Sequence, residues 1–249
     1  GGLPAAVEAL PDFSEWGEVE RVTMNGIRKA TAQHMTRSWT NIPHVTQNDR
    51  ADITDLEVLR KRWTKRAEKE GVKLTPTAIL AKIVASALKV FPEFNASIDI
   101  AAKEIVFKKY IHIGIAVDTT KGLVVPVLRD VDEKNIIELA KELGEIAGRA
   151  RDGKLVLAEM QGGTFTISNL GGIGGSHFTP IVNFPEVAIL GVGRATVEPV
   201  WQNGEFVPRS MMPLSLSYDH RLIDGASAAR FLRWLAEAIE EPLLLAMEG

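Results

Sequence analysis

Residues 205–225 read EFVPRSMMPLSLSYDHRLIDG, and this stretch predicts a long strand that leads directly into a helix. We expect the strand over 205–218 and the helix from about 225 to 240. Between them, over 217–225, polar and titratable side chains gather where the strand ends. This junction is the part of the chain in which candidate chemistry is most concentrated.

The long strand is predicted to be one arm of a hairpin. Asn203-Gly204 separates it from another strand-like stretch over 197–202. A two-residue type I′ turn needs positive φ at both of its positions, which asparagine and glycine adopt readily. The two stretches are therefore expected to pair.

Strands and helices are mixed along the remainder of the chain. The residue pattern predicts helices at 25–39, 54–71, 76–91 and 133–150, and strands at 104–118, 123–128, 163–169 and 186–194. This mixture favours one α/β sandwich. Residues 1 to about 18 contain prolines without clear periodicity and are expected to be the remnant of a linker, with the domain itself over 19–249.

Two local motifs add detail to this outline. The stretch Thr54-Asp55-Leu56-Glu57 matches a capping box and is expected to open the 54–71 helix. The glycine-rich segment 171–175 fits neither a dinucleotide-binding fingerprint nor a P-loop. A tight turn that lets two backbones pack closely is the better interpretation of these glycines.

The composition excludes several classes of function. The 249 residues carry a formal net charge of -3, which gives no reason to expect a nucleic-acid or anionic-membrane partner, and no apolar run is long enough to span a bilayer. The chain contains no cysteine. Disulfides, thiolate metal sites and a cysteine nucleophile are therefore excluded, and any thiol chemistry must involve thiols of the substrates.

Histidine is the natural candidate for acid–base chemistry in such a chain. None of the five histidines pairs with another at a spacing typical of metal ligands, so no metal site is expected. His220 lies in the strand–helix junction and can act as a neutral base at pH 7 if its tautomer is fixed. Two alternatives remain open: a purely structural histidine at a strand end, and an Asp224 that simply caps the last helix.

The sequence resembles a known family at several places in the same order. His220-x-x-x-Asp224-Gly225 resembles the signature shared by dihydrolipoyl acyltransferases and chloramphenicol acetyltransferases. Five further segments look like the dihydrolipoyl acyltransferases, namely 41–46, 112–118, 122–127, 162–169 and 185–191. The resemblance covers about residues 20–249. It implies an α/β fold of the chloramphenicol-acetyltransferase type, a two-layer sandwich with a mixed sheet and flanking helices.

The resemblance also implies roles for individual residues. His220 would be the general base, Asp224 its signature partner, and Ser168 the hydroxyl that stabilises a tetrahedral intermediate. Coenzyme A contacts are implied at Arg60, Thr75, Asp118, Ser168 and Asn169. Arg28 is a candidate cation opposite Asp224. Ordinary structural roles stay open for several of them, such as a solvated charge for Arg28 and Arg60 and a backbone-bonded serine for Ser168.

The chemistry of thioester exchange agrees with these roles. A thiol with a pKa of about 8.5 is mostly protonated at pH 7, so a base that removes its proton accelerates attack on a thioester. Negative charge then develops on the carbonyl oxygen, where a hydroxyl donor such as Ser168 stabilises it. Without a cysteine, and without Gly-x-Ser-x-Gly around Ser168, direct transfer in a ternary complex is expected rather than a covalent acyl-enzyme.

Members of this family form trimers, with the active site between subunits. The resemblance therefore implies a homotrimer in which one chain supplies His220 and its neighbour Ser168, assembled into a core of 24 or 60 subunits. It also implies coenzyme A as substrate, a lipoyl group carried on a separate domain, and partnership with decarboxylase and dihydrolipoyl dehydrogenase components. The apolar tail 242–247 would be costly to expose, so it is expected either to dock on another subunit or to pack on its own.

Segments 43–47 and 52–57 look most like the acetyl-transferring branch that serves pyruvate dehydrogenase. The branched-chain and succinyl-transferring branches remain alternatives. So do a catalytically idle core protein and an O-acetyltransferase of the chloramphenicol type. A bacterial cytoplasmic location is favoured over the mitochondrial matrix.

Overall fold

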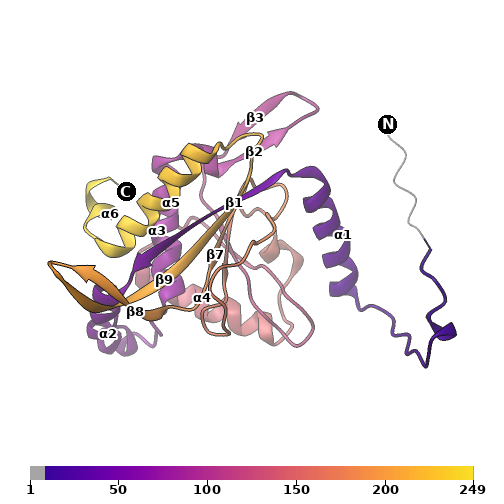
Figure 1. Cartoon of the computed structure of the whole chain (residues 1–249), viewed down its shortest axis with the longest axis horizontal. Coiled ribbons are helices and arrows are strands. Elements are labelled where there is room, and N and C mark those ends of the chain that lie inside the picture. Colours follow the sequence, from indigo (N-terminus) through magenta and orange to yellow (C-terminus); the bar gives the residue numbers. More distant parts are fainter. Residues whose placement is uncertain (1–8, 249) are drawn as a thin grey trace.

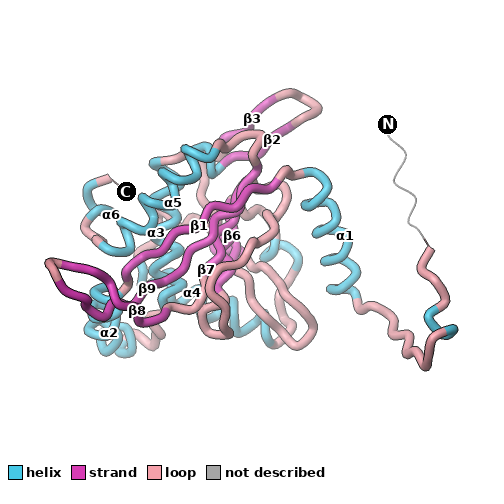
Figure 2. The backbone as a smooth tube through the Cα atoms, in the orientation of Figure 1, coloured by secondary structure: helices cyan, strands magenta, loops and turns pink. Residues whose placement is uncertain are grey.

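A seven-stranded mixed sheet forms the centre of the molecule in the computed structural model, which describes residues 9–248. Its strands lie in the order β1-β9-β7-β6-β4-β5, and β8 pairs with β9; β1, β9, β7 and β6 lie next to one another in Figure 2. β4, β6 and β7 are parallel, whereas β9 is antiparallel to β7 and β1. The strands are β1 (His44–Asp52), β4 (Ile113–Ile115), β5 (Val127–Leu128), β6 (Phe165–Asn169), β7 (Ala188–Val192), β8 (Thr196–Gln202) and β9 (Glu205–Asp219).

Helices cover one face of this sheet, and a small hairpin stands apart from it. Figure 1 shows α3 and α5 along the sheet and α1 projecting from the body of the molecule. The longer helices are α1 (Gly26–Asn41), α2 (Thr54–Lys69), α3 (Pro76–Val90), α4 (Ile136–Arg151) and α5 (Gly225–Glu240), followed by the short α6 (Leu244–Met247). The separate hairpin pairs β2 (Ala96–Asp99) with β3 (Glu104–Phe107). Within the described chain, no helix is long and apolar enough to cross a membrane.

The two faces of the sheet differ in chemistry. Leu214, Leu216 and Tyr218 of β9 point into the main hydrophobic core beneath the helices. The residues that alternate with them, Ser215 and Ser217, are also buried but lie on the opposite face. This second, polar face is therefore covered by protein without being part of the main core.

The local predictions for the last third of the chain are confirmed. β9 and α5 match the expected strand and helix at 205–218 and 225–240. The turn residues Asn203 and Gly204 have φ of 53° and 93°, as a type I′ turn requires. The helices predicted elsewhere, and the strands predicted at 163–169 and 186–194, are also present within a few residues of their expected ends.

The prediction of one continuous strand over 104–118 is wrong. That stretch forms β3 and β4, which belong to different sheets. The chain turns between them, where the buried Asn95 amide donates to the carbonyls of Lys108 and Tyr110 at 3.0 and 2.9 Å. The strand predicted over 123–128 is shorter than expected. Only Val127–Leu128 form a strand, and Val124 makes a single bridge to Val117.

The capping box predicted at the start of α2 is wrong, although the helix itself is present. The N-cap is Ile53, which makes no side-chain capping bond. The Thr54 hydroxyl instead donates to Asp52 Oδ1 at 2.6 Å and accepts from the Ser210 amide at 2.8 Å. Glu57 is bonded to Arg60 rather than to the helix terminus. The two side chains that matched the motif therefore have other partners: Thr54 bonds Asp52 of β1 and Ser210 of β9, and Glu57 bonds Arg60 within the helix.

Close backbone packing at the glycine-rich segment is confirmed. A Cβ on Gly171 would lie 3.0 Å from the carbonyl oxygen of Gly193. A Cβ on Gly193 would lie 1.8 Å from the carbonyl oxygen of Ser176. The segment after β6 thus lies against the end of β7, and glycine is required for that approach.

Candidate active site

His220 is exposed and stands immediately beyond the end of β9. Its backbone N–H donates to the Pro43 carbonyl at 3.1 Å, and the N–H of the preceding residue, Asp219, donates to Val187 at 2.8 Å. Its ring centroid is 5.9 Å from that of Tyr218, with the two planes 32° apart. Segments on both sides of β9 therefore hold the backbone from which this imidazole projects.

Asp224, four residues later, is the N-cap of α5. Its carboxylate accepts from the Ser227 backbone N–H at 2.8 Å. This bond, together with a second from the Ala226 amide and the charges of Arg230 and His220, lowers the pKa of Asp224. Arg230 contributes its charge to this shift, whereas Arg28 is not among the groups that act on this carboxylate.

Ser168 lies near the opposite ends of the strands from His220, and we call these two sets of strand ends the two edges of the sheet. It is half-buried on β6 and pairs with Gly191 of β7, which in turn pairs with Ser215 of β9. His220 lies five positions beyond Ser215, which is about 17 Å along the strand direction. One chain therefore does not bring Ser168 and His220 together.

The residues proposed to contact coenzyme A share the edge of Ser168. The Asn169 amide donates to Thr77 Oγ1 at 3.1 Å, which connects β6 to the first turn of α3. Thr75 caps that helix by accepting from the Ala78 N–H at 3.3 Å. Arg60 Nη1 donates to the Leu74 carbonyl at 3.2 Å. These contacts form a continuous chain of neighbours from Arg60 to β6.

Asp118 leaves the sheet at the same edge. It is exposed and follows β4, which runs parallel to β6. The Ala116 N–H, two residues earlier, bonds the Ile167 carbonyl at 3.0 Å. The structure thus divides the predicted site residues into two groups: His220 and Asp224 at one edge, and Arg60, Thr75, Asp118, Ser168 and Asn169 at the other.

The charge of Arg60 is already compensated within the chain. Its Nε and Nη2 donate to the two carboxylate oxygens of Glu57 at 2.8 and 2.7 Å. These hydrogen bonds raise the pKa of Arg60 and lower that of Glu57. A phosphate that binds here must share the guanidinium with Glu57.

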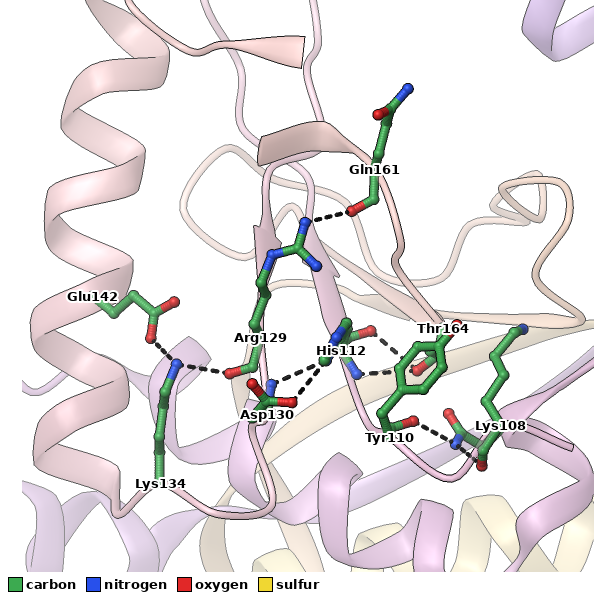
Figure 3. Close-up of polar contacts among 10 residues, drawn as sticks. Lys108, Tyr110, His112, Arg129, Asp130, Lys134, Glu142, Gln161 and Thr164 are labelled. Carbon is green, nitrogen blue, oxygen red and sulfur yellow. Dashed lines mark hydrogen bonds and ion pairs between the residues drawn. The ribbon is translucent and has the colours of Figure 1, made fainter. Parts of the chain in front are cut away.

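Other histidines have visible structural roles. His44 Nε2 accepts from the Val182 N–H at 3.0 Å, so its Nδ1 carries the proton and donates to Ile42 O at 2.8 Å. His112 Nδ1 accepts from the Asp130 N–H at 3.0 Å, with its ring 4.7 Å from that of Tyr110 (Figure 3). His112 is therefore part of a polar network that holds loops near β4. No group of acidic or histidine side chains suited to a metal ion occurs between residues 9 and 248.

Sequence reasoning missed the buried Glu186, which precedes β7. Its carboxylate accepts from Thr166 Oγ1 at 2.7 Å and from Asn183 Nδ2 at 3.1 Å. Burial raises the pKa of Glu186 from 4.5 to about 7, and burial lowers the pKa of Lys108 to about 8 although Glu186 attracts its charge. Nothing in the local pattern distinguishes Glu186 from a surface residue, because its environment is built from distant segments.

Relative to the parent, the Glu186→Gln variant is expected to become progressively more stable as the pH rises from 5 to 7. The folded pKa of Glu186 lies above its ordinary value, so the parent loses stability between about pH 4.5 and pH 7 as the buried carboxyl ionises. We expect the free energy of unfolding of the variant to exceed that of the parent by roughly 2 kcal/mol more at pH 7 than at pH 5. Denaturant unfolding at the two pH values measures this difference, and an equal effect at both would contradict it.

Comparison with known proteins adds an independent line of evidence. Residues 17–247 match the family model for the 2-oxoacid dehydrogenases acyltransferase catalytic domain. The dihydrolipoyllysine-residue acetyltransferase components of the pyruvate dehydrogenase complexes of Haemophilus influenzae and Pseudomonas aeruginosa are 53% and 54% identical over 95% and 96% of the chain. The chain spans 42% and 44% of the length of these relatives.

Solved structures give the same likeness. The dihydrolipoamide acetyltransferase of Azotobacter vinelandii and the cubic core of the pyruvate dehydrogenase multienzyme complex each give a TM-score of 0.93 at 50% identity, covering 96% of this chain and all of theirs. Chloramphenicol acetyltransferase gives a TM-score of 0.52 at 15% identity, covering 84% of this chain and 92% of that one, which is a likeness of fold alone. The predicted α/β fold is therefore confirmed.

Proposed function

The chain belongs to the 2-oxoacid dehydrogenase acyltransferase family as its catalytic domain, and from this we propose that it transfers an acetyl group between coenzyme A and a dihydrolipoyl group. The observation that carries the proposal is the division of the site between two edges of the sheet. An exposed histidine base lies at one edge, and a serine with a cluster of polar groups lies at the other. Two copies of the chain can complete both halves at a shared boundary.

The residue spacing in a relative supports the assignment of roles. The study of the Azotobacter vinelandii enzyme concerns a serine, a histidine and an asparagine in its catalytic mechanism. The serine precedes the histidine by 52 positions and the histidine precedes the asparagine by 4, as Ser168, His220 and Asp224 are spaced here. Asparagine and aspartate cap helices about equally well, so this difference supports a positioning role for Asp224 rather than a need for its charge.

The proposed reaction is a direct thiol–thioester exchange. The imidazole of His220 takes the proton of the attacking thiol as the sulfur bonds the thioester carbonyl carbon. The Ser168 hydroxyl of a neighbouring chain donates to the oxygen that becomes negative in the tetrahedral intermediate. Collapse breaks the bond to the other sulfur, which leaves as a thiolate and takes the proton back from the imidazolium. The acyl group changes carrier, and the enzyme returns to its starting protonation state.

Coenzyme A is proposed to enter at the edge formed by the carboxyl ends of β4 and β6. Arg60, Thr75, Asp118 and Asn169 gather there beside Ser168. The dihydrolipoyl group, carried on a domain outside this chain, would approach from the His220 edge. The fact that the chain spans less than half of its relatives is compatible with such separate carrier domains.

We further propose a homotrimer that assembles into a cubic core, in contact with decarboxylase and dihydrolipoyl dehydrogenase components. The solved cubic core with a TM-score of 0.93 supports this arrangement.

A groove of about 920 Å³ lies between α2, α3 and the chain end, with an apolar floor that includes Leu56, Leu74 and Ile79. Leu244 and Leu245 of the tail pack against the core of their own chain, whereas Leu243 and Met247 are 68% and 75% exposed, and this exposed side of the tail supports docking on another copy. The bacterial relatives support a bacterial cytoplasmic location.

Acyl preference tests the proposed function directly. With dihydrolipoamide as acceptor, we expect kcat/KM for acetyl-coenzyme A to exceed that for isobutyryl- and succinyl-coenzyme A by at least about tenfold, since added groups must fit the same pocket. Faster isobutyryl or succinyl transfer would assign the chain to another branch of the family. No transfer from any donor would favour an idle core, and faster transfer to a hydroxyl acceptor would favour the chloramphenicol type of activity.

A further inference from the structure

Asp219 and Arg221 flank the proposed base on both sides in sequence and bind each other. Arg221 Nε lies 2.9 Å from Asp219 Oδ1, and Nη2 lies 2.5 Å from Oδ2. The backbone N–H of Arg221 also donates to Oδ1 at 3.0 Å. The side chain of Arg221 therefore turns back to bind Asp219, the residue on the other side of His220 in the sequence.

The burial of this pair is unequal. The Asp219 side chain is 2% exposed, the lowest value for an acidic partner in the ion pairs of the described chain, whereas Arg221 is 32% exposed. A buried carboxylate without a compensating cation is strongly unfavourable. Since Arg221 is the cation bonded to Asp219, the two charges cancel beside His220.

The pair also holds the local backbone. The Asp219 carbonyl accepts from the N–H groups of Leu222 and Ile223 at 3.1 and 3.0 Å, which closes a tight turn around His220. The N–H of His220 itself bonds Pro43. The bonds within the turn and the side-chain fork together leave the imidazole little freedom beyond its own side-chain rotations.

We propose that Asp219 and Arg221 form a charge-neutral clamp that positions His220 without placing a net charge next to it. This inference rests on the proposed role of His220 as base. Neither clamp residue needs to touch substrate, so both are positioning residues. A neutral pair supplies rigidity without a local charge that would favour one protonation state of the neighbouring imidazole.

Removing either charge of the clamp should shift the pH midpoint of His220 protonation, and the two substitutions should shift it in opposite directions. Arg221→Gln leaves the Asp219 carboxylate uncompensated, which favours the imidazolium, whereas Asp219→Asn leaves the Arg221 cation, which favours the neutral ring. Charged or titratable groups also lie on the surrounding elements, namely Asp224 at the N-cap of α5, Arg230 of α5, Tyr218 of β9, His44 of β1 and Glu186 before β7. These groups are present in both variants, so shifts in opposite directions must arise from the charges of Asp219 and Arg221.

The test measures His220 by two independent readouts on the assembled protein. The rate of diethyl pyrocarbonate modification of His220, followed by peptide mass spectrometry across pH, reports its protonation. We expect its midpoint to move by about half to one pH unit, upward in Arg221→Gln and downward in Asp219→Asn. The double variant should return the midpoint to the parent value. The acid limb of kcat/KM should move in the same directions.

Positioning has its own signature. We expect kcat to fall roughly tenfold in each single variant and in the double variant, with KM for acetyl-coenzyme A unchanged, because the fork that holds the turn is lost in all three. Arg221→Lys keeps the charge without the bidentate geometry, so it should lower kcat while leaving the His220 midpoint in place. Midpoints that do not move, or that move in one direction in both single variants, would overturn the clamp.

A matched pair on the same strand serves as the control. Arg209, near the start of β9, binds Asp52 of β1, and their side chains are 24% and 20% exposed. Arg209→Gln and Asp52→Asn repeat the two substitutions far from His220 and should leave its midpoint and kcat unchanged. His220→Ala, assayed alongside, separates the role of His220 as base from the role of the clamp. If it leaves acetyl transfer intact, the proposed function fails; if it abolishes transfer while the clamp variants behave as the parent, only the clamp fails.

Discussion

His220→Ala is expected to lower kcat for acetyl transfer from acetyl-coenzyme A to dihydrolipoamide by roughly 10²–10⁴-fold. The variant cannot take the proton of the attacking thiol, and the chain has no cysteine that could replace this route with a covalent intermediate. We expect KM for acetyl-coenzyme A to change by no more than about twofold, because the residues proposed to bind it lie at the other edge of the sheet. Steady-state kinetics at saturating dihydrolipoamide measure both values.

The effect should be chemical rather than structural. His220 is exposed at a strand end, so its truncation leaves no buried cavity and the unfolding temperature should stay within about 1 °C of the parent. His44→Ala is the matched contrast, because the His44 ring bonds two backbone groups and its loss should destabilise the fold. A variant at His220 that keeps the parental kcat would remove this residue from the mechanism.

The second large effect is the recovery of activity by mixing two nearly inactive chains. Ser168→Ala alone is expected to lose about 10²–10³ in kcat, as for removal of one donor to an oxyanion. When it is co-assembled in equal amounts with His220→Ala, about one quarter of the sites should combine an intact His220 from one chain with an intact Ser168 from the next. The mixture should therefore regain about a quarter of the parental activity.

Complementation distinguishes a site shared between two chains from a site within one chain, whatever acyl group the protein prefers. A double variant carrying both substitutions, co-assembled with His220→Ala, provides the control, because no site in that mixture has an intact histidine. Activity equal to the average of the two separate variants would mean that Ser168 and His220 act within one chain. The roughly 17 Å that separate them along the sheet argue for the first outcome.

Short-range signals in the sequence predicted much of the fold. Asn203-Gly204 specified its turn because only the two residues themselves must adopt positive φ. Asp224 specified the start of α5 because an N-cap bonds an amide three residues away. The positions of His220, Asp224 and Ser168 at strand and helix ends were visible for the same reason.

Longer-range contacts defeated the same reasoning elsewhere. The alternating apolar residues of 104–118 are divided between two sheets, since Asn95 bonds the carbonyls of Lys108 and Tyr110 and turns the chain. The motif at Thr54 lost its capping role because β9 offered the hydroxyl another partner. In each case a distant segment competed successfully with the local preference.

The sequence by itself determined which residues carry the candidate chemistry: a cysteine-free chain with a histidine at the end of a long strand and a serine at the end of a shorter one. Only the tertiary structure decided where they lie. The antiparallel pairing of β9 with β7 sends His220 to one edge of the sheet, and the parallel pairing of β6 with β7 sends Ser168 to the other. Strand order and direction depend on pairing between segments far apart in the chain, which no local pattern encodes. The burial of Glu186 and the clamp around His220 depend on the same long-range pairing.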